Sequence, residues 1–225
     1  MTLETALTGL LTDPVVVAVW VVLVASSLVV LAWDLRTNNP ETASLMQFAW
    51  GLSTLYSGPI ALGAYWYAGR SQIASDSLWR KGFRSVTHCY SGCGAGEVVG
   101  VVTMAGVFAV SSTALTAAVT FSLAYLFGFA LTIGPLLQEG VGFREALSDS
   151  FYSETASITV MEVAAIGTDI WIAGDAHIGA LLFWTGLAFS LSVGYFVAYP
   201  VNVYLVHRGV KGGMQNPTER GQTTS

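Results

Sequence analysis

Long apolar runs constrain this chain more than any other feature of its sequence. The first run extends from Pro14 to Trp33 and carries no charged residue. It has the length of about 20 residues that an α-helix needs to cross the core of a bilayer. Only 10% of the 225 residues are charged and 53% are hydrophobic, whereas a soluble domain carries about 25% charged residues. The sequence therefore predicts a membrane protein whose main partner is the lipid bilayer.

Five further apolar stretches follow, and none shows the strict alternation of a transmembrane β-barrel strand. We therefore predict an all-α polytopic fold with one transmembrane domain over residues 1–210 and a disordered polar tail over residues 211–225. Gly58 and Pro59 interrupt the second stretch, so a kink is expected there. The six predicted spans cover residues 14–33, 45–68, 86–110, 114–137, 150–173 and 178–206.

The basic residues predict the orientation of the chain in the membrane. With six spans both termini lie on one side, and eight of the nine Lys and Arg residues fall on that side, in the loops 69–85 and 138–149 and in the tail. Only Arg36 falls on the other side. Because basic residues collect on the cytoplasmic side, we expect a multi-pass protein of the cell membrane with both termini cytoplasmic. So few basic residues argue against nucleic acid as a partner.

The third predicted span begins with a polar cluster of His88, Cys89, Cys93 and Glu97. Ionisable groups inside a bilayer are costly and mark functional sites. Cys89 and Cys93 are one helical turn apart, so both thiols can reach one ion. Thiolates select soft ions such as Cu(I) or Zn(II), and imidazole binds both. The cluster therefore predicts a site for a transition metal ion, copper or zinc, with these four residues as ligands; the alternative is that each cysteine is buried as a small apolar residue.

A stripe of small residues, Gly92, Gly96 and Gly100, lies beside this cluster on the same helix. Small residues at this spacing let a neighbouring helix approach closely. We expect the fifth predicted span to be that neighbour. The stripe also permits a homo-oligomer without requiring one.

The fifth predicted span carries three carboxylates, Glu154, Glu162 and Asp169, within an arc of about 100°. Carboxylates along one helix face indicate a relay for cations or protons. The alternative is a hydrogen-bond network that holds helices together. Met161 on the same face and Met104 on the third span are possible thioether ligands, although single methionines in apolar helices are usually packing residues.

The polar stretches resemble an uncharacterised family of prokaryotic membrane proteins, the domain of unknown function DUF4396. The pattern His-Cys-x-x-Gly-Cys at His88–Cys93 is the most recognisable part of the resemblance, which covers roughly residues 45–214. The resemblance implies a helical membrane protein and singles out the two polar helices, and it implies no activity. The supporting stretches are Ser153–Ser157, Met161 with Glu162, Pro200–Asn202 and Arg208–Met214.

The favoured function is the binding or transport of a metal cation, copper-like first and zinc second, through the His/Cys/Glu site. Two alternatives stay open. One is an enzyme that uses the same cluster, either a membrane thiol oxidoreductase or a metal-dependent membrane enzyme. The other is a structural membrane subunit that has no ligand. In a short outer loop, Asp175 and His177 are either an entry site or solvated residues.

Overall fold

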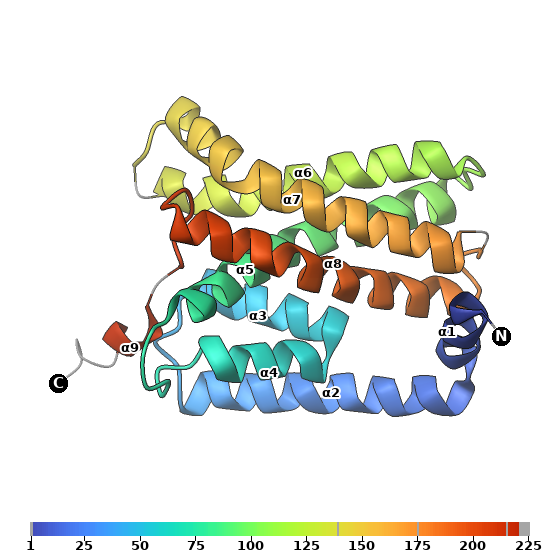
Figure 1. Cartoon of the computed structure of the whole chain (residues 1–225), viewed down its shortest axis with the longest axis horizontal. Coiled ribbons are helices and arrows are strands. Elements are labelled where there is room, and N and C mark those ends of the chain that lie inside the picture. The colour runs from blue at the N-terminus through green and yellow to red at the C-terminus, as the bar shows by residue number, and fades with distance from the viewer. Residues whose placement is uncertain (1, 139, 175, 215, 221–225) are drawn as a thin grey trace.

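The computed structural model describes residues 2–138, 140–174, 176–214 and 216–220, and every regular element among them is helical. Most of the helices run along the longest dimension of the molecule and form an elongated bundle (Figure 1). The all-α prediction is therefore confirmed. The elements are α1 (Leu3–Thr12), α2 (Pro14–Thr37), α3 (Ser44–Ser57), α4 (Pro59–Ala68), α5 (Leu78–Val101), the π-helix η1 (Val102–Val107), α6 (Thr113–Gln138), α7 (Phe143–Ala173), α8 (Leu181–His207) and α9 (Pro217–Arg220).

Four helices, α2, α6, α7 and α8, are long and apolar enough to cross a bilayer. They correspond to the first, fourth, fifth and sixth predicted spans, and they identify the chain as a helical membrane protein. The start of α2 follows from its sequence. Pro14 occupies the first turn, and Asp13 Oδ1 accepts hydrogen bonds from the N–H groups of Val15 and Val16 at 2.8 and 3.1 Å, which caps the free donors at the helix start.

The third predicted span is α5 together with η1, and it lies in the middle of the bundle. It contacts α3, α4, α6, α7 and α8, and every residue from Arg84 to Gly94 is buried. This polar stretch of α5 is thereby shielded from lipid. After Val101 the backbone continues as the six-residue π-helix, which changes the rotation per residue, so Met104 does not keep the angular position expected from a regular α-helix.

The glycine stripe of Gly92, Gly96 and Gly100 packs against α6. A Cβ added at Gly96 would lie 2.7 Å from the Ala124 Cα and would also collide with the Leu123 carbonyl oxygen. Only glycine permits such an approach, because the atoms that a side chain would meet belong to the backbone of α6. The prediction that the fifth span is the close neighbour of this stripe is therefore wrong, since that span is α7.

The second predicted span is a hairpin of two helices, α3 and α4, that run in opposite directions (Figure 1). Gly58 reverses the chain with a φ of +53°, which side chains disfavour, and Pro59 begins α4. The N–H of Ser71 donates to Asn39 Oδ1 at 2.8 Å, so the chain leaves α4 close to where it enters α3. With 14 and 10 residues, the helices extend only about 21 and 15 Å, short of the ~30 Å bilayer core.

The first and last helices lie at opposite ends of the bundle (Figure 1). The short helix α1 packs against α7 and α8 at one end, whereas α8 finishes at the other end. Because α3 and α4 return to the side from which they start, the helices of the described residues that run the length of the bundle are α2, α5 with η1, α6, α7 and α8. The predicted count of six spans and the predicted placement of both termini on one side are therefore not confirmed.

The basic residues gather at the end of the bundle where α8 finishes. All nine Lys and Arg residues belong to segments at this end. Arg36, the exception in the sequence-based topology, lies in the last turn of α2. That turn is held to the loop after α4 by an ion pair, with Arg70 Nη2 3.0 Å from Asp34 Oδ1. Because the hairpin returns the chain to the end from which it starts, Arg36 lies at the same end of the bundle as the other basic residues.

Candidate functional site

The two cysteines form a thiol pair (Cys89 and Cys93) at the junction of α5, α6 and α7. Their Sγ atoms are 3.9 Å apart on successive turns of α5, and both residues are free and buried. The hydroxyl of Ser157 on α7 donates to Cys89 Sγ at 3.6 Å. Cys93 Sγ faces α6, where a Cβ on Gly128 would lie 2.8 Å from the sulfur. The contact between the thiols agrees with their spacing of one helical turn.

A chain of hydrogen bonds leads from the thiol pair to the basic end of the bundle, and we call it the lysine network (Lys211, Asn202, Ser157 and Glu154). Asn202 Nδ2 donates to Ser157 Oγ at 2.6 Å. Lys211 Nζ donates to Asn202 Oδ1 at 2.9 Å and to Glu154 Oε2 at 2.6 Å. The side chains of Lys211 and Glu154 are each only 3% exposed. The lysine network therefore ends in a buried ion pair between the thiol pair and the basic end of the bundle.

Sequence reasoning missed Lys211, because it assigned this residue to the polar tail. The structure packs the beginning of the tail onto the bundle: the carbonyl of Gly213 accepts a hydrogen bond from Arg84 Nε at 2.9 Å. Residue 215 and residues 221–225 of the predicted tail lie outside the described residues. The one signal that could have found Lys211 was the family resemblance, which extends through Arg208–Met214.

The predicted carboxylate relay divides into different environments. Glu154 belongs to the lysine network, while Glu162 is fully buried and neither of its carboxylate oxygens has a hydrogen-bond partner. Glu97 on α5 is 1% exposed, and its Oε2 also lacks a partner. Glu97 interacts electrostatically with both Glu162 and Asp169. Glu97 therefore lies within electrostatic range of two other acidic groups in the half of the bundle away from Lys211.

The structure does not gather the four predicted metal ligands around one point. His88 is buried and its Nδ1 has no hydrogen-bond partner. Within the described residues, no group of three or more His, Cys, Asp and Glu side chains is arranged to hold a metal ion. The four-ligand set of His88, Cys89, Cys93 and Glu97 stays a prediction, and only the two cysteines are seen in contact.

The remaining candidates are two buried methionines and two residues that precede α8. Met104 in η1 and Met161 in α7 are both buried. Met161 packs towards α8, where a Cβ on Gly194 would lie 3.2 Å from its Cγ. His177 is exposed in the loop before α8, and Asp175 lies outside the described residues.

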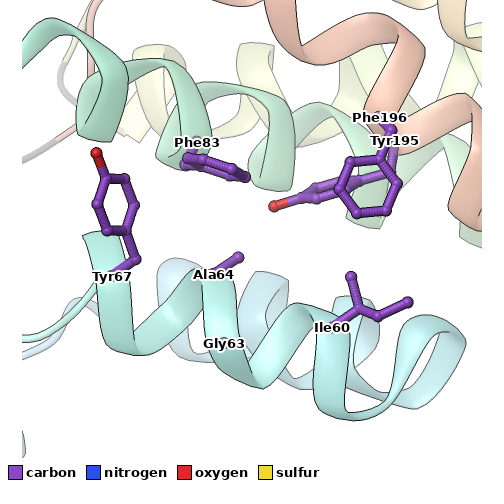
Figure 2. A pocket seen from close by; sticks show the side chains of 7 residues that line it. All are labelled: Ile60, Gly63, Ala64, Tyr67, Phe83, Tyr195 and Phe196. Atoms are coloured by element: carbon purple, nitrogen blue, oxygen red, sulfur yellow. The ribbon is translucent and has the colours of Figure 1, made fainter.

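An apolar pocket of about 240 Å³ lies beside the hairpin (Figure 2). Ile60 and Ala64 of α4 form one wall, and Phe83 of α5 with Tyr195 of α8 forms the facing wall. None of the predicted site residues lines this pocket. The pocket is therefore separate from the thiol pair and from the acidic groups.

The candidate site residues lie within the part of the chain that matches a known family. The family described as a domain of unknown function, DUF4396, matches residues 78–211. This match begins with α5, contains the thiol pair and the three carboxylates of the predicted relay, and ends at Lys211. No curated protein and no solved structure matches the chain. Because the match covers more than half of the 225 residues, the chain belongs to the DUF4396 family.

Proposed function

We propose that this membrane protein binds a soft metal cation, copper(I)-like, at the thiol pair between α5, α6 and α7. The observation that carries the proposal is the 3.9 Å separation of the two Sγ atoms. Two sulfurs bound to one metal at about 2.3 Å lie about 3.8 Å apart at a tetrahedral angle, so the pair can take an ion with little movement. Thiolates favour soft ions, which agrees with an all-sulfur pair.

The number of gathered ligands favours copper(I) over zinc. Copper(I) is satisfied by two thiolates, which open towards a linear arrangement around it, whereas structural zinc takes four protein ligands. No third ligand group is gathered with the cysteines among the described residues. Copper is therefore the ion of first choice, and zinc would need His88 and Glu97 to move towards the thiols.

The buried acidic groups support a further part of the proposal, which is that the protein transports the cation as well as binding it. Glu162 and Glu97 keep unpaired carboxylate oxygens inside the bundle, and Asp169 lies within electrostatic range of Glu97. Buried carboxylates of this kind relay cations or protons in membrane proteins. Glu154 would join this relay only when Lys211 releases it, so the lysine network is the closed end of the proposed path.

The expected result of metal analysis is one copper(I) ion per chain after anaerobic loading of the purified protein. Cys89→Ser and Cys93→Ser should each lower the copper affinity at least tenfold, because one thiolate ligand is lost. The matched control is Ser91→Ala on the same helix, whose hydroxyl donates only to the His88 carbonyl. Copper content near zero in the unmodified protein, or copper content unchanged by both cysteine variants, contradicts the proposal.

The same thiol pair supports a second candidate, a membrane thiol oxidoreductase. The two free thiols lie 3.9 Å apart, and a disulfide requires about 2.05 Å, so both side chains would have to turn within one helix. Thiol trapping of the same copper-free samples under reducing and oxidising conditions separates the candidates. A pair that cycles between two thiols and a disulfide, without binding copper, favours the enzyme.

The topology proposed for this function has five crossings, with the C-terminus in the cytoplasm and the N-terminus outside. It is supported by the basic residues, which all belong to one end of the bundle and mark the cytoplasmic side. In intact cells, a membrane-impermeant maleimide should label Thr5→Cys but should label Arg208→Cys only after lysis. The unmodified chain is the control, since its two cysteines are buried. Labelling of Arg208→Cys from outside contradicts this orientation.

A further inference from the structure

A groove between α6 and α7 leads from the surface of the bundle to Glu162. It has a volume of about 520 Å³ and is lined by apolar and small residues, among them Phe121, Ala118 and Gly167. Val163, which also lines the groove, is 63% exposed, so the groove opens on the side of the bundle that faces lipid. Its volume falls within the range of about 300–1,000 Å³ that is usual for ligand sites.

Glu162 is one of the residues that line this groove, and its buried carboxyl group has no partner from the described part of the chain. The residue is 0% exposed and neither Oε1 nor Oε2 is hydrogen-bonded. The hydroxyl of Ser122, also in the groove, donates to the Ala118 carbonyl at 2.8 Å. The nearby titratable groups that act on Glu162 are Glu97 and Cys89, and neither is a cation. A buried carboxyl that no neighbour satisfies is costly inside a bilayer, so a ligand that satisfies it would be stabilised.

The depth and charge of the groove define the head group of such a ligand. Glu162 precedes the end of α7 at Ala173 by about 16 Å of helix, close to half the thickness of a bilayer core. Phospholipid head groups do not reach this depth. No Lys or Arg lines the groove, so a phosphate would meet only a carboxyl. A neutral hydroxyl fits, because it can donate to a carboxylate and can accept from a protonated carboxyl.

We propose that the α6–α7 groove binds a neutral, lipid-soluble molecule whose hydroxyl head hydrogen-bonds to Glu162. The apolar body of the ligand lies along Ala118, Phe121 and Gly167, and it enters sideways from the bilayer. A hydroquinone and an isoprenoid alcohol share this chemistry. The site shares Glu162 with the proposed relay, but its ligand is a different one and its binding does not depend on the thiol pair.

The proposal is tested by labelling the full chain in phospholipid vesicles with dicyclohexylcarbodiimide, a lipid-soluble reagent for carboxyl groups, and mapping the adduct by mass spectrometry. We expect labelling at Glu162, abolished by Glu162→Gln. Decylhydroquinone and farnesol are added separately as competitors. At least a fivefold slower labelling by one or both supports the proposal, and the more effective competitor identifies the source of the hydroxyl.

A matched pair of glycine variants tests whether the reagent travels through the groove. A Cβ at Gly167 meets no atom within 4 Å, and the same holds for Gly134 on α6, which does not line the groove. Gly167→Leu should fill the groove and slow labelling at least tenfold, whereas Gly134→Leu should leave it unchanged. In a chain with both Cys89→Ser and Cys93→Ser, the alcohols should still slow the labelling of Glu162, which separates this proposal from the copper site. Absence of labelling at Glu162, or labelling that neither alcohol slows, overturns the proposal.

Discussion

Replacing Lys211 by methionine is expected to lower the free energy of unfolding by about 3–5 kcal/mol, the usual cost of removing one partner of a buried ion pair. The reason is the environment of Glu154, whose side chain is 3% exposed and whose Oε2 lies 2.6 Å from Lys211 Nζ. Methionine fills a similar volume but leaves this carboxylate without a positive charge. Asn202 Oδ1 also loses a donor at 2.9 Å. Loss of helical circular dichroism with increasing denaturant, in detergent micelles, measures the effect.

A second substitution, added to Lys211→Met, shows whether the loss of stability comes from the uncompensated charge of Glu154. Adding Glu154→Gln to the Lys211→Met chain should restore at least half of the lost stability, because a neutral amide replaces the uncompensated carboxylate. Lys81→Met is the matched control: Lys81 is half-buried, and it forms no ion pair among the described residues. The free energy of unfolding of the Lys81→Met chain should change by less than about 0.5 kcal/mol. A Lys211→Met chain as stable as the unmodified protein would contradict a buried ion pair at this end.

The second large effect is expected from one added methyl group on the central helix. Gly96→Ala should lower the free energy of unfolding by about 3 kcal/mol, at the upper end of the cost of overpacking. The new Cβ would lie 2.7 Å from the Ala124 Cα, and backbone atoms of α6 cannot rotate away as a side chain can. The two helices must therefore move apart beside the thiol pair. The same denaturant titration measures the loss.

Gly51→Ala on α3 is the matched control for this substitution. A Cβ at Gly51 meets no atom within 4 Å, so only the helix propensity changes there, and alanine should stabilise the protein by up to about 1 kcal/mol. The two variants make the same chemical change in a helix and should shift stability in opposite directions. Equal effects of both variants would show that α5 and α6 are not in close contact at Gly96.

Much of the fold could be predicted from the sequence, because apolar length is a local property. The runs that became α2, α6, α7 and α8 were visible as spans, and the spacing of Cys89 and Cys93 predicted their contact. The hairpin was not visible, since residues 45–68 have the length and composition of one span. What reverses the chain is the positive φ of Gly58, whose Cβ position would lie 2.8 Å from Val24 Cγ2 of α2. Because this contact joins two different helices, the local sequence of residues 45–68 does not reveal it.

The contacts of the polar site could likewise be predicted only in part from the sequence. The sequence identified the polar faces of α5 and α7, and a helical projection grouped Glu154, Glu162 and Asp169 on one face. It could not show that Glu154 pairs with Lys211, because 57 residues separate them along the chain. Nor could it show that Glu162 lines a groove, which depends on how α6 and α7 diverge. The spacing of residues along one helix fixes which of them share a face. It does not fix which helix or side chain that face packs against.

The α3–α4 hairpin has a consequence for the biogenesis of the protein. The ribosome delivers the hairpin before α5 and α8, two of the helices against which α3 packs. Neither arm, of 14 and 10 residues, is long enough to be released into the bilayer as an independent span. We therefore expect the hairpin to complete its packing only after α5 and α8 have been inserted. The second apolar segment to be synthesised should then be among the last to reach its final contacts.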